Sequence, residues 1–141
     1  MRAVFDTNII LSAALWGGPP RHALQAIREG HATLISSDEL IEELKTVLAR
    51  AKFVPRLAEI NRTADELIAD YQQLAEMTVP ADVGRVVPND SKDDKFIACA
   101  VGGRATLVVS GDSHLLRLGQ YDNIEVITVQ QFLERIYPPD E

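Results

Sequence analysis

The sequence predicts an α/β fold, a three-layer α/β/α sandwich around a central parallel sheet of about five strands. Short apolar runs alternate with amphipathic helical stretches along the whole chain, and this alternation is typical of parallel sheets with helices on both faces. The first apolar run, residues 3–5, ends directly at Asp6. In open α/β sheets, ligands bind just outside the carboxyl ends of the strands, so this acid stands where an active-site residue would stand.

Chain length and net charge indicate the number of domains and the kind of ligand that the protein can bind. The chain has 141 residues, 46% of them hydrophobic, and a net charge of −7. A chain of this length buries roughly 68–70% of its unfolded surface, so we expect one domain over residues 1–137 and a disordered tail at 138–141. The negative charge argues against binding nucleic acid through phosphate neutralisation alone, but it permits an acidic site that is neutralised by a divalent metal.

Cysteine content and hydropathy point to a cytoplasmic protein. Cys99 is the single cysteine, so no intramolecular disulfide can form, which fits a reducing compartment. No apolar run approaches the roughly 18 residues of a membrane span. The first strand begins too early, and carries Asp6 too early, for a signal peptide. We therefore expect no association with membranes.

The strands are predicted from short apolar runs bounded by turn residues. They lie at residues 3–5, 32–35, 77–79, 106–109 and 124–127. Residues 16–20 contain two glycines and two prolines and should break the chain. Residues 52–61, which include Pro55, are expected to form a loop or short turn. The polar stretch 82–90 is expected to be a turn-rich loop.

The helices are predicted from apolar residues at three-and-four spacing and from capping residues. They are expected at residues 9–15, 21–29, 38–50, 63–76, 92–101 and 129–136, with a short helical turn at 115–118. The pair Ser36-Ser37 is expected to cap the third helix, and Ser36 and Glu39 have the spacing of a capping box. Thr128 and Gln131 have the same spacing before the last helix.

Three strand ends lead into carboxylates. Asp6 follows the first strand, and Asp112 comes three residues after the strand 106–109. The second strand leads into helix 38–50, where Glu43 lies roughly 100° from the centre of the apolar stripe, at the edge of the buried face. Glu39 and Glu42 lie roughly 140–160° away from it, towards solvent.

The helix 92–101 is preceded by a further group of acids, Asp90, Asp93 and Asp94. Acids at a helix N-terminus often only cap the helix, and capping is enough to explain Asp90. Asp93 and Asp94 precede Ile97 by four and three residues, so either one can align with the buried stripe of this helix.

Such a group of carboxylates requires a counter-charge. Hard divalent ions such as Mg²⁺ or Mn²⁺ take carboxylate oxygens, activate water and stabilise a phosphate undergoing displacement. His22, His31 and His114 are scattered and, with the single cysteine, have no zinc-site spacing. No phosphate-binding glycine motif and no serine nucleophile motif occurs.

Four segments together resemble the PIN-domain ribonucleases, in particular the toxins of prokaryotic type II toxin–antitoxin pairs. They are Val4-Phe-Asp-Thr-Asn8, Ser36-x6-Glu43-Leu44, Asp90-x2-Asp93-Asp94-Lys-Phe-Ile97-x2-Ala100 and Val109-Ser-Gly-Asp112-x2-Leu115-Leu116. The segments occur in the order and spacing of that family, and they extend over most of the chain.

The resemblance implies a Mg²⁺- or Mn²⁺-dependent endoribonuclease that cuts RNA. It implies a metal-binding, catalytic set made of Asp6, Glu43, Asp112 and one acid of the Asp93–Asp94 pair. Asp93 is favoured by its spacing from Asp90. Asn8 and Ser110 would support these acids and the bound water through hydrogen bonds. The resemblance also implies a homodimer and a small antitoxin protein that reaches into the acidic groove.

Two alternatives remain at this point. A PIN-like module that has kept its acids could act only by binding protein or RNA. An aspartyl-phosphate enzyme could use Asp6 as its nucleophile, although such phosphatases usually have a second aspartate two residues later, where this chain has Asn8.

Overall fold

A computed structural model describes residues 1–87 and 90–139. Its sheet has the strand order β3-β2-β1-β4-β6-β5. The strands are β1 (Arg2–Phe5), β2 (Thr33–Ser36), β3 (Glu76–Met77), β4 (Leu107–Val109), β5 (Gln120–Tyr121) and β6 (Ile124–Ile127). All neighbouring strands pair in parallel except β5, which pairs antiparallel with β6. The predicted parallel sheet is confirmed, with one additional short strand at its edge.

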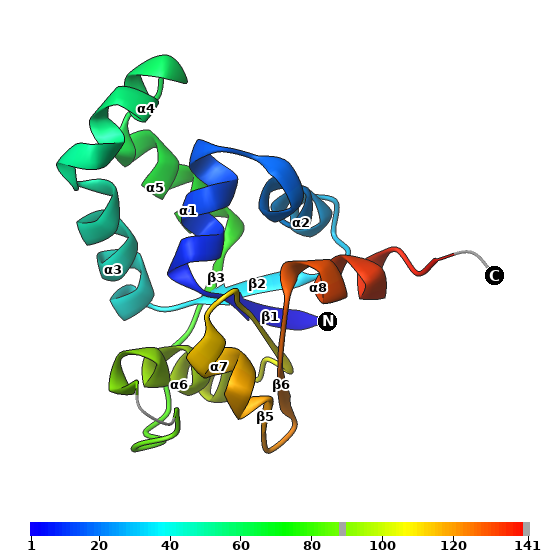
Figure 1. Cartoon of the computed structure of the whole chain (residues 1–141). Helices are drawn as coiled ribbons and strands as arrows, with labels where there is room; N and C mark the ends of the chain where they lie inside the picture. Colours follow the sequence, from blue (N-terminus) through cyan, green and yellow to red (C-terminus); the bar gives the residue numbers. More distant parts are fainter. Residues whose placement is uncertain (88–89, 140–141) are drawn as a thin grey trace.

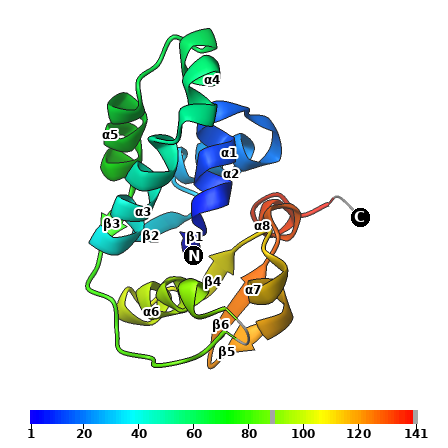
Figure 2. The ribbon, with the colours of Figure 1, turned by 60° about the vertical axis from the view of Figure 1, so that its left-hand side comes forward.

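Helices cover both faces of the sheet, which confirms the predicted three layers (Figures 1 and 2). On one face lie α1 (Thr7–Leu15), α2 (Gly18–Arg28), α3 (Asp38–Leu48), α5 (Ala64–Leu74) and α8 (Val129–Ile136). The other face carries α6 (Asp94–Gly102), preceded by the 3-10 turn Ser91–Asp93, and α7 (Ser113–Leu118).

Successive side chains of β1 point alternately into two hydrophobic cores, one on each face of the sheet. Ala3 and Phe5 point into the core under α1, α2 and α8, where the Phe5 ring meets the edge of Phe132 at 5.2 Å between centroids. Val4 points to the opposite face, among the side chains of α6 and α7. Both faces of β1 are therefore buried, which fixes the register of the central strand.

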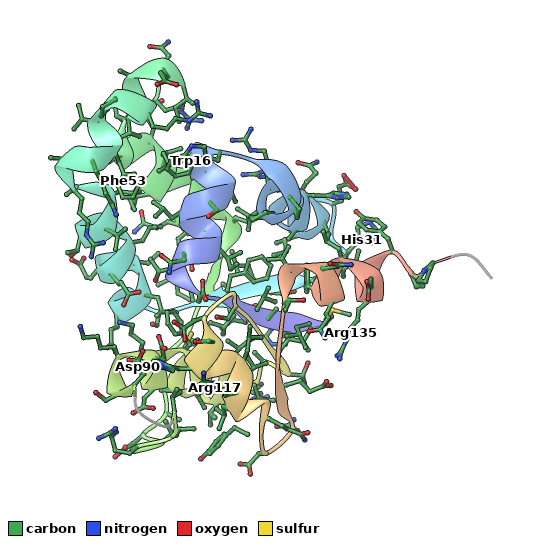
Figure 3. All side chains as sticks on the ribbon, in the orientation of Figure 1. Trp16, His31, Phe53, Asp90, Arg117 and Arg135 are labelled. Carbon is green, nitrogen blue, oxygen red and sulfur yellow. The ribbon has the colours of Figure 1, made fainter. Side chains whose placement is uncertain are left out.

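The prediction of a loop or short turn over residues 52–61 is wrong for most of this stretch. A 3-10 turn at Ala51–Phe53 leads into the short helix α4 (Val54–Glu59). Pro55 occupies the second helical position, where its missing N–H costs nothing. The Phe53 ring packs edge-on against Trp16, with 6.0 Å between centroids (Figure 3).

The capping box predicted for Ser36 and Glu39 is also wrong. Ser37 caps α3 instead, and its hydroxyl accepts the backbone N–H of Leu40 at 3.4 Å. Ser36 belongs to β2, is fully buried, and accepts a hydrogen bond of 2.7 Å from the Tyr71 hydroxyl. The capping box of Thr128 and Gln131 is confirmed.

The predicted tail lies partly outside the described residues, which end at position 139, so the domain boundary at 137 stays a prediction. The predicted polar loop 82–90 also includes two positions, 88 and 89, outside the described residues. Within the part of the chain that the structure describes, no helix has the length and apolarity needed to cross a membrane.

Candidate metal centre

The carboxyl ends of β1 and β4 bring Asp6 and Asp112 to the same edge of the sheet. Phe5 and Val109 are paired in the two strands, and the Asp6 N–H donates to the Val109 carbonyl at 3.0 Å. Each acid also caps the helix that follows it. Asp6 Oδ1 accepts the N–H of Ile9 at 2.9 Å, and Asp112 Oδ1 accepts the N–H groups of His114 and Leu115 at 2.8 and 3.2 Å.

Ser110 joins these two acids. Its hydroxyl donates to Asp6 Oδ2 and accepts the backbone N–H of Asp112 at 2.9 Å. Ser110 is fully buried and Asp6 is only 3% exposed. The serine therefore holds the Asp6 carboxylate in one orientation and sets the start of the turn that carries Asp112, which agrees with the supporting role implied by the resemblance.

Glu43 reaches the same region from α3. Its carboxylate accepts the hydroxyl of Thr7 and forms an ion pair with Lys95 of α6. Glu43 is half-buried, whereas Glu39 and Glu42 are exposed. The helical periodicity thus identified which glutamate lies at the edge of the buried face.

The neighbouring acids Asp93 and Asp94 have different surroundings. Asp94 Oδ1 accepts the backbone N–H groups of Val86 and Val87 at 3.1 and 2.7 Å, and its Oδ2 lies 3.5 Å from Nε of Arg85. Its carboxylate is therefore engaged with the segment before the helix. Asp93 instead lines a cavity together with Asp6. The structure brings together Asp6, Glu43, Asp93 and Asp112, and it leaves Asp94 outside this group.

The cavity has a volume of about 520 Å³ and is lined by carboxylates and by three basic side chains, Arg50, Lys92 and Lys95, which we call its basic rim. Asn8 lines it with an exposed side chain. The complete lining is Asp6, Thr7, Asn8, Glu39, Glu43, Thr46, Val47, Arg50, Asp90, Lys92, Asp93, Lys95, Phe96 and Asp112. A site for an anionic substrate beside a cation has this distribution of charge.

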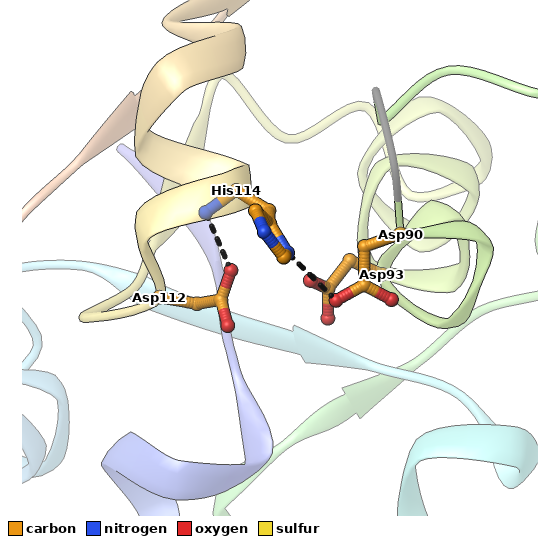
Figure 4. Close-up of side chains that lie close together, drawn as sticks. All are labelled: Asp90, Asp93, Asp112 and His114. Atoms are coloured by element: carbon orange, nitrogen blue, oxygen red, sulfur yellow. Dashed lines mark hydrogen bonds and ion pairs between the residues drawn. The ribbon is translucent and has the colours of Figure 1, made fainter.

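Sequence reasoning missed two members of this region, Asp90 and His114. Asp90 was explained as a helix cap and His114 as one of three scattered histidines. In the structure, His114 Nδ1 lies 3.1 Å from Asp90 Oδ2. One ring nitrogen of His114 and one carboxylate oxygen each of Asp90, Asp93 and Asp112 lie within 4.8 Å of one another (Figure 4). The Asp112-x-His114 spacing at the end of β4 was the signal that could have revealed it.

The close carboxylates shift each other's protonation. Burial, followed by the close approach of the Asp90 and Asp112 carboxylates, raises the pKa of Asp93 to about 7. Burial also raises the pKa of Asp6, against the opposing effect of the Ser110 hydroxyl. The hydrogen bond with His114 lowers the pKa of Asp90. A positive charge among these carboxylates would favour the ionised form of Asp93 and of Asp6.

A divalent cation fits these residues. Asp93 Oδ2 is buried and has no hydrogen-bond partner within the described part of the chain. Buried carboxylate oxygens without a partner are costly and rare. Six of the residues that line the cavity are carboxylates, whose oxygens are the ligands that Mg²⁺ and Mn²⁺ prefer.

Comparisons with known proteins agree with the fold. A family model described as PIN domain matches residues 2–114. The fold is similar to that in a crystal structure of VapBC2 from Rickettsia felis bound to a DNA fragment from their promoter. The TM-score is 0.64 and the identity 13%, with 91% of this chain and 98% of that chain covered. It is also similar to PAE2754 from Pyrobaculum aerophilum, with a TM-score of 0.58, 16% identity and coverage of 99% and 91%. No curated protein matches the sequence.

Proposed function

This chain belongs to the PIN domain family, and from this premise we propose that it is a metal-dependent endoribonuclease, the toxin of a toxin–antitoxin pair. The observation that carries the proposal is the meeting of Asp6, Glu43, Asp93 and Asp112 on one cavity. These acids come from four separate parts of the chain. Asp93 Oδ2, which is buried and has no hydrogen-bond partner among the residues that the structure describes, supports the presence of a cation among them.

Asp6, Asp93 and Asp112 would hold the ion, which we propose to be Mg²⁺ or Mn²⁺. Such an ion, when bound, lowers the pKa of a water ligand and stabilises charge on the phosphate. Ser110 keeps Asp6 oriented, because its hydroxyl bonds one carboxylate oxygen while the Ile9 N–H bonds the other. Glu43 completes the acidic set from α3, in contact with Thr7.

The basic rim gives the acidic cavity a means to hold RNA. Arg50, Lys92 and Lys95 line the same cavity as the acids. They would bind phosphates on either side of the scissile bond, while the acids remain neutralised by the ion. A net charge of −7 is compatible with RNA cleavage if the attraction is confined to this rim.

The toxin role is supported by the family resemblance and by the similarity to VapBC2. We propose a small cognate antitoxin as the partner, one that reaches into the cavity and blocks it, and a homodimer acting in the cytoplasm. Co-expression with the product of a short adjacent gene tests the partner. Relief of growth arrest together with co-purification would support it, and unchanged growth arrest would contradict it.

The enzymatic proposal is tested by RNA cleavage in Mg²⁺ or Mn²⁺ with the wild type and Asp6→Asn. We expect a loss beyond the roughly 10–100-fold typical of residues that only support a metal ligand. Asp122→Asn is the matched control, because Asp122 is exposed in the β5–β6 turn and should leave cleavage unchanged. Equal activity of Asp6→Asn and the wild type would reject the mechanism. An absence of Mn²⁺ uptake in calorimetry would favour a binding module instead.

A further inference from the structure

His114 is placed beside the acids by one of the acids themselves. Asp112 caps α7, and its Oδ1 accepts the backbone N–H of His114 at 2.8 Å. The imidazole then extends from α7 towards the entrance of α6, where Nδ1 lies 3.1 Å from Asp90 Oδ2 (Figure 4). We call Asp90, Asp93, Asp112 and His114 the histidine corner of the cavity.

The spacing within the histidine corner suits a single ion. One ring nitrogen and three carboxylate oxygens lie within 4.8 Å of one another. Ligands about 2.1 Å from an octahedral ion are separated by about 3 Å when adjacent and about 4 Å when opposite. The four donor atoms therefore need to move little to surround one cation.

A second observation points to a ligand at the same place. Asp93 Oδ2 is buried, and it has no hydrogen-bond partner among the described residues. Asp90 and Asp112 offer no donor to this oxygen while they are ionised. A cation in the histidine corner would satisfy the orphaned oxygen and the imidazole lone pair together.

We propose that His114 is a direct nitrogen ligand in the histidine corner and that this ligand makes the centre prefer Mn²⁺ to Mg²⁺. The inference rests on the proposed function, because it assumes that the cavity holds a divalent ion. Imidazole nitrogen suits first-row transition metals, whereas Mg²⁺ is a hard ion that takes oxygen and keeps several waters. Carboxylates alone would discriminate between the two ions less.

Pulsed electron paramagnetic resonance of the Mn²⁺-loaded protein tests direct coordination, because a bound imidazole gives a ¹⁴N modulation. We expect this modulation in the wild type and in His31→Ala, and its loss in His114→Ala. His31 is a suitable control because it is exposed and lies far from Asp90 on the molecule (Figure 3). His114→Gln is a second variant, since its amide can still bond Asp90 but supplies no imidazole nitrogen.

Calorimetry with Mn²⁺ and with Mg²⁺ tests the preference. We expect His114→Ala to weaken Mn²⁺ binding by more than the roughly 10–100-fold typical of residues that only support a metal ligand, and Mg²⁺ binding by less than about threefold. Equal weakening of both ions, or bound Mn²⁺ without a ¹⁴N modulation in the wild type, would overturn the role of His114 while leaving the ribonuclease proposal intact. Failure of the wild type to bind Mn²⁺ at all would overturn both.

Discussion

Replacing Asp93 with asparagine should stabilise the metal-free protein while weakening its metal site. The carboxylate of Asp93 has a pKa of about 7 in the folded protein, against an ordinary value of 3.8. Because the folded-state pKa is raised, the associated stability is fully present below about pH 4 and is lost as the pH rises through about 7. Without metal, the wild type should therefore become less stable as the pH rises from about 4 to about 7. Asp6, whose pKa is also raised, acts in the same direction.

The expected change in the free energy of unfolding follows from the shift in the pKa of Asp93. Three pKa units correspond to about 4 kcal/mol as an upper bound. Because solvent reaches part of the Asp93 side chain, about 1–2 kcal/mol is a reasonable expectation after screening. For a chain of this length, that change moves the melting temperature by roughly 3–8 °C. Asparagine keeps the shape, removes the repulsion and can donate to the carboxylates of Asp90 or Asp112.

The assay is thermal unfolding at pH 5 and pH 8, with a chelator and with Mn²⁺. At pH 8 with chelator, Asp93→Asn should have a higher melting temperature than the wild type. Addition of Mn²⁺ should raise the melting temperature of the wild type by more than that of Asp93→Asn. Asp94→Asn is the matched control, and it should melt lower, because the Asp94 carboxylate accepts the N–H groups of Val86 and Val87. A less stable Asp93→Asn at pH 8, or a wild type that gains stability from pH 5 to pH 8 without metal, would refute this reasoning.

Two further predictions concern residues around the cavity and beneath it. Lys95→Met removes the ammonium group that pairs with Glu43 and competes with a metal ion for its carboxylate. The affinity for Mn²⁺, measured by calorimetry, should therefore increase by roughly 3–10-fold. A lower affinity would contradict the assignment of Glu43 to the metal centre. Tyr71→Phe removes the buried 2.7 Å hydrogen bond to Ser36 and should lower the free energy of unfolding in urea by about 1–2 kcal/mol; an unchanged midpoint would show that this bond adds no stability.

Local patterns in the sequence predicted most of the fold. The apolar run before Asp6 and the capping box of Thr128 are both decided by neighbours a few residues away, so sequence spacing was enough to find them. The helix α4 was missed because it has only six residues and begins at Val54-Pro55, although proline is tolerated in the first turn of a helix. The strand β5 was missed because two residues carry no periodicity.

The site was only partly predictable, because contacts between residues distant in sequence decide which side chains belong to it. Helical spacing alone could not separate Asp93 from Asp94, and the backbone of Val86 and Val87 decides which carboxylate is engaged elsewhere. The partner of His114 is Asp90, 24 positions earlier in the chain. The Asp112-x-His114 spacing could have drawn attention to the histidine, but its pairing with Asp90 forms only when α7 is packed beside the start of α6.

The most direct test of the account is a crystal structure of the protein soaked in Mn²⁺, with anomalous scattering used to locate the ion. The account predicts an anomalous peak inside the cavity, about 2.0–2.3 Å from carboxylate oxygens of Asp93 and of Asp6 or Asp112. A peak found only on the outer surface, with the Asp6 and Asp93 carboxylates unliganded, would contradict the claim that these acids form one metal centre.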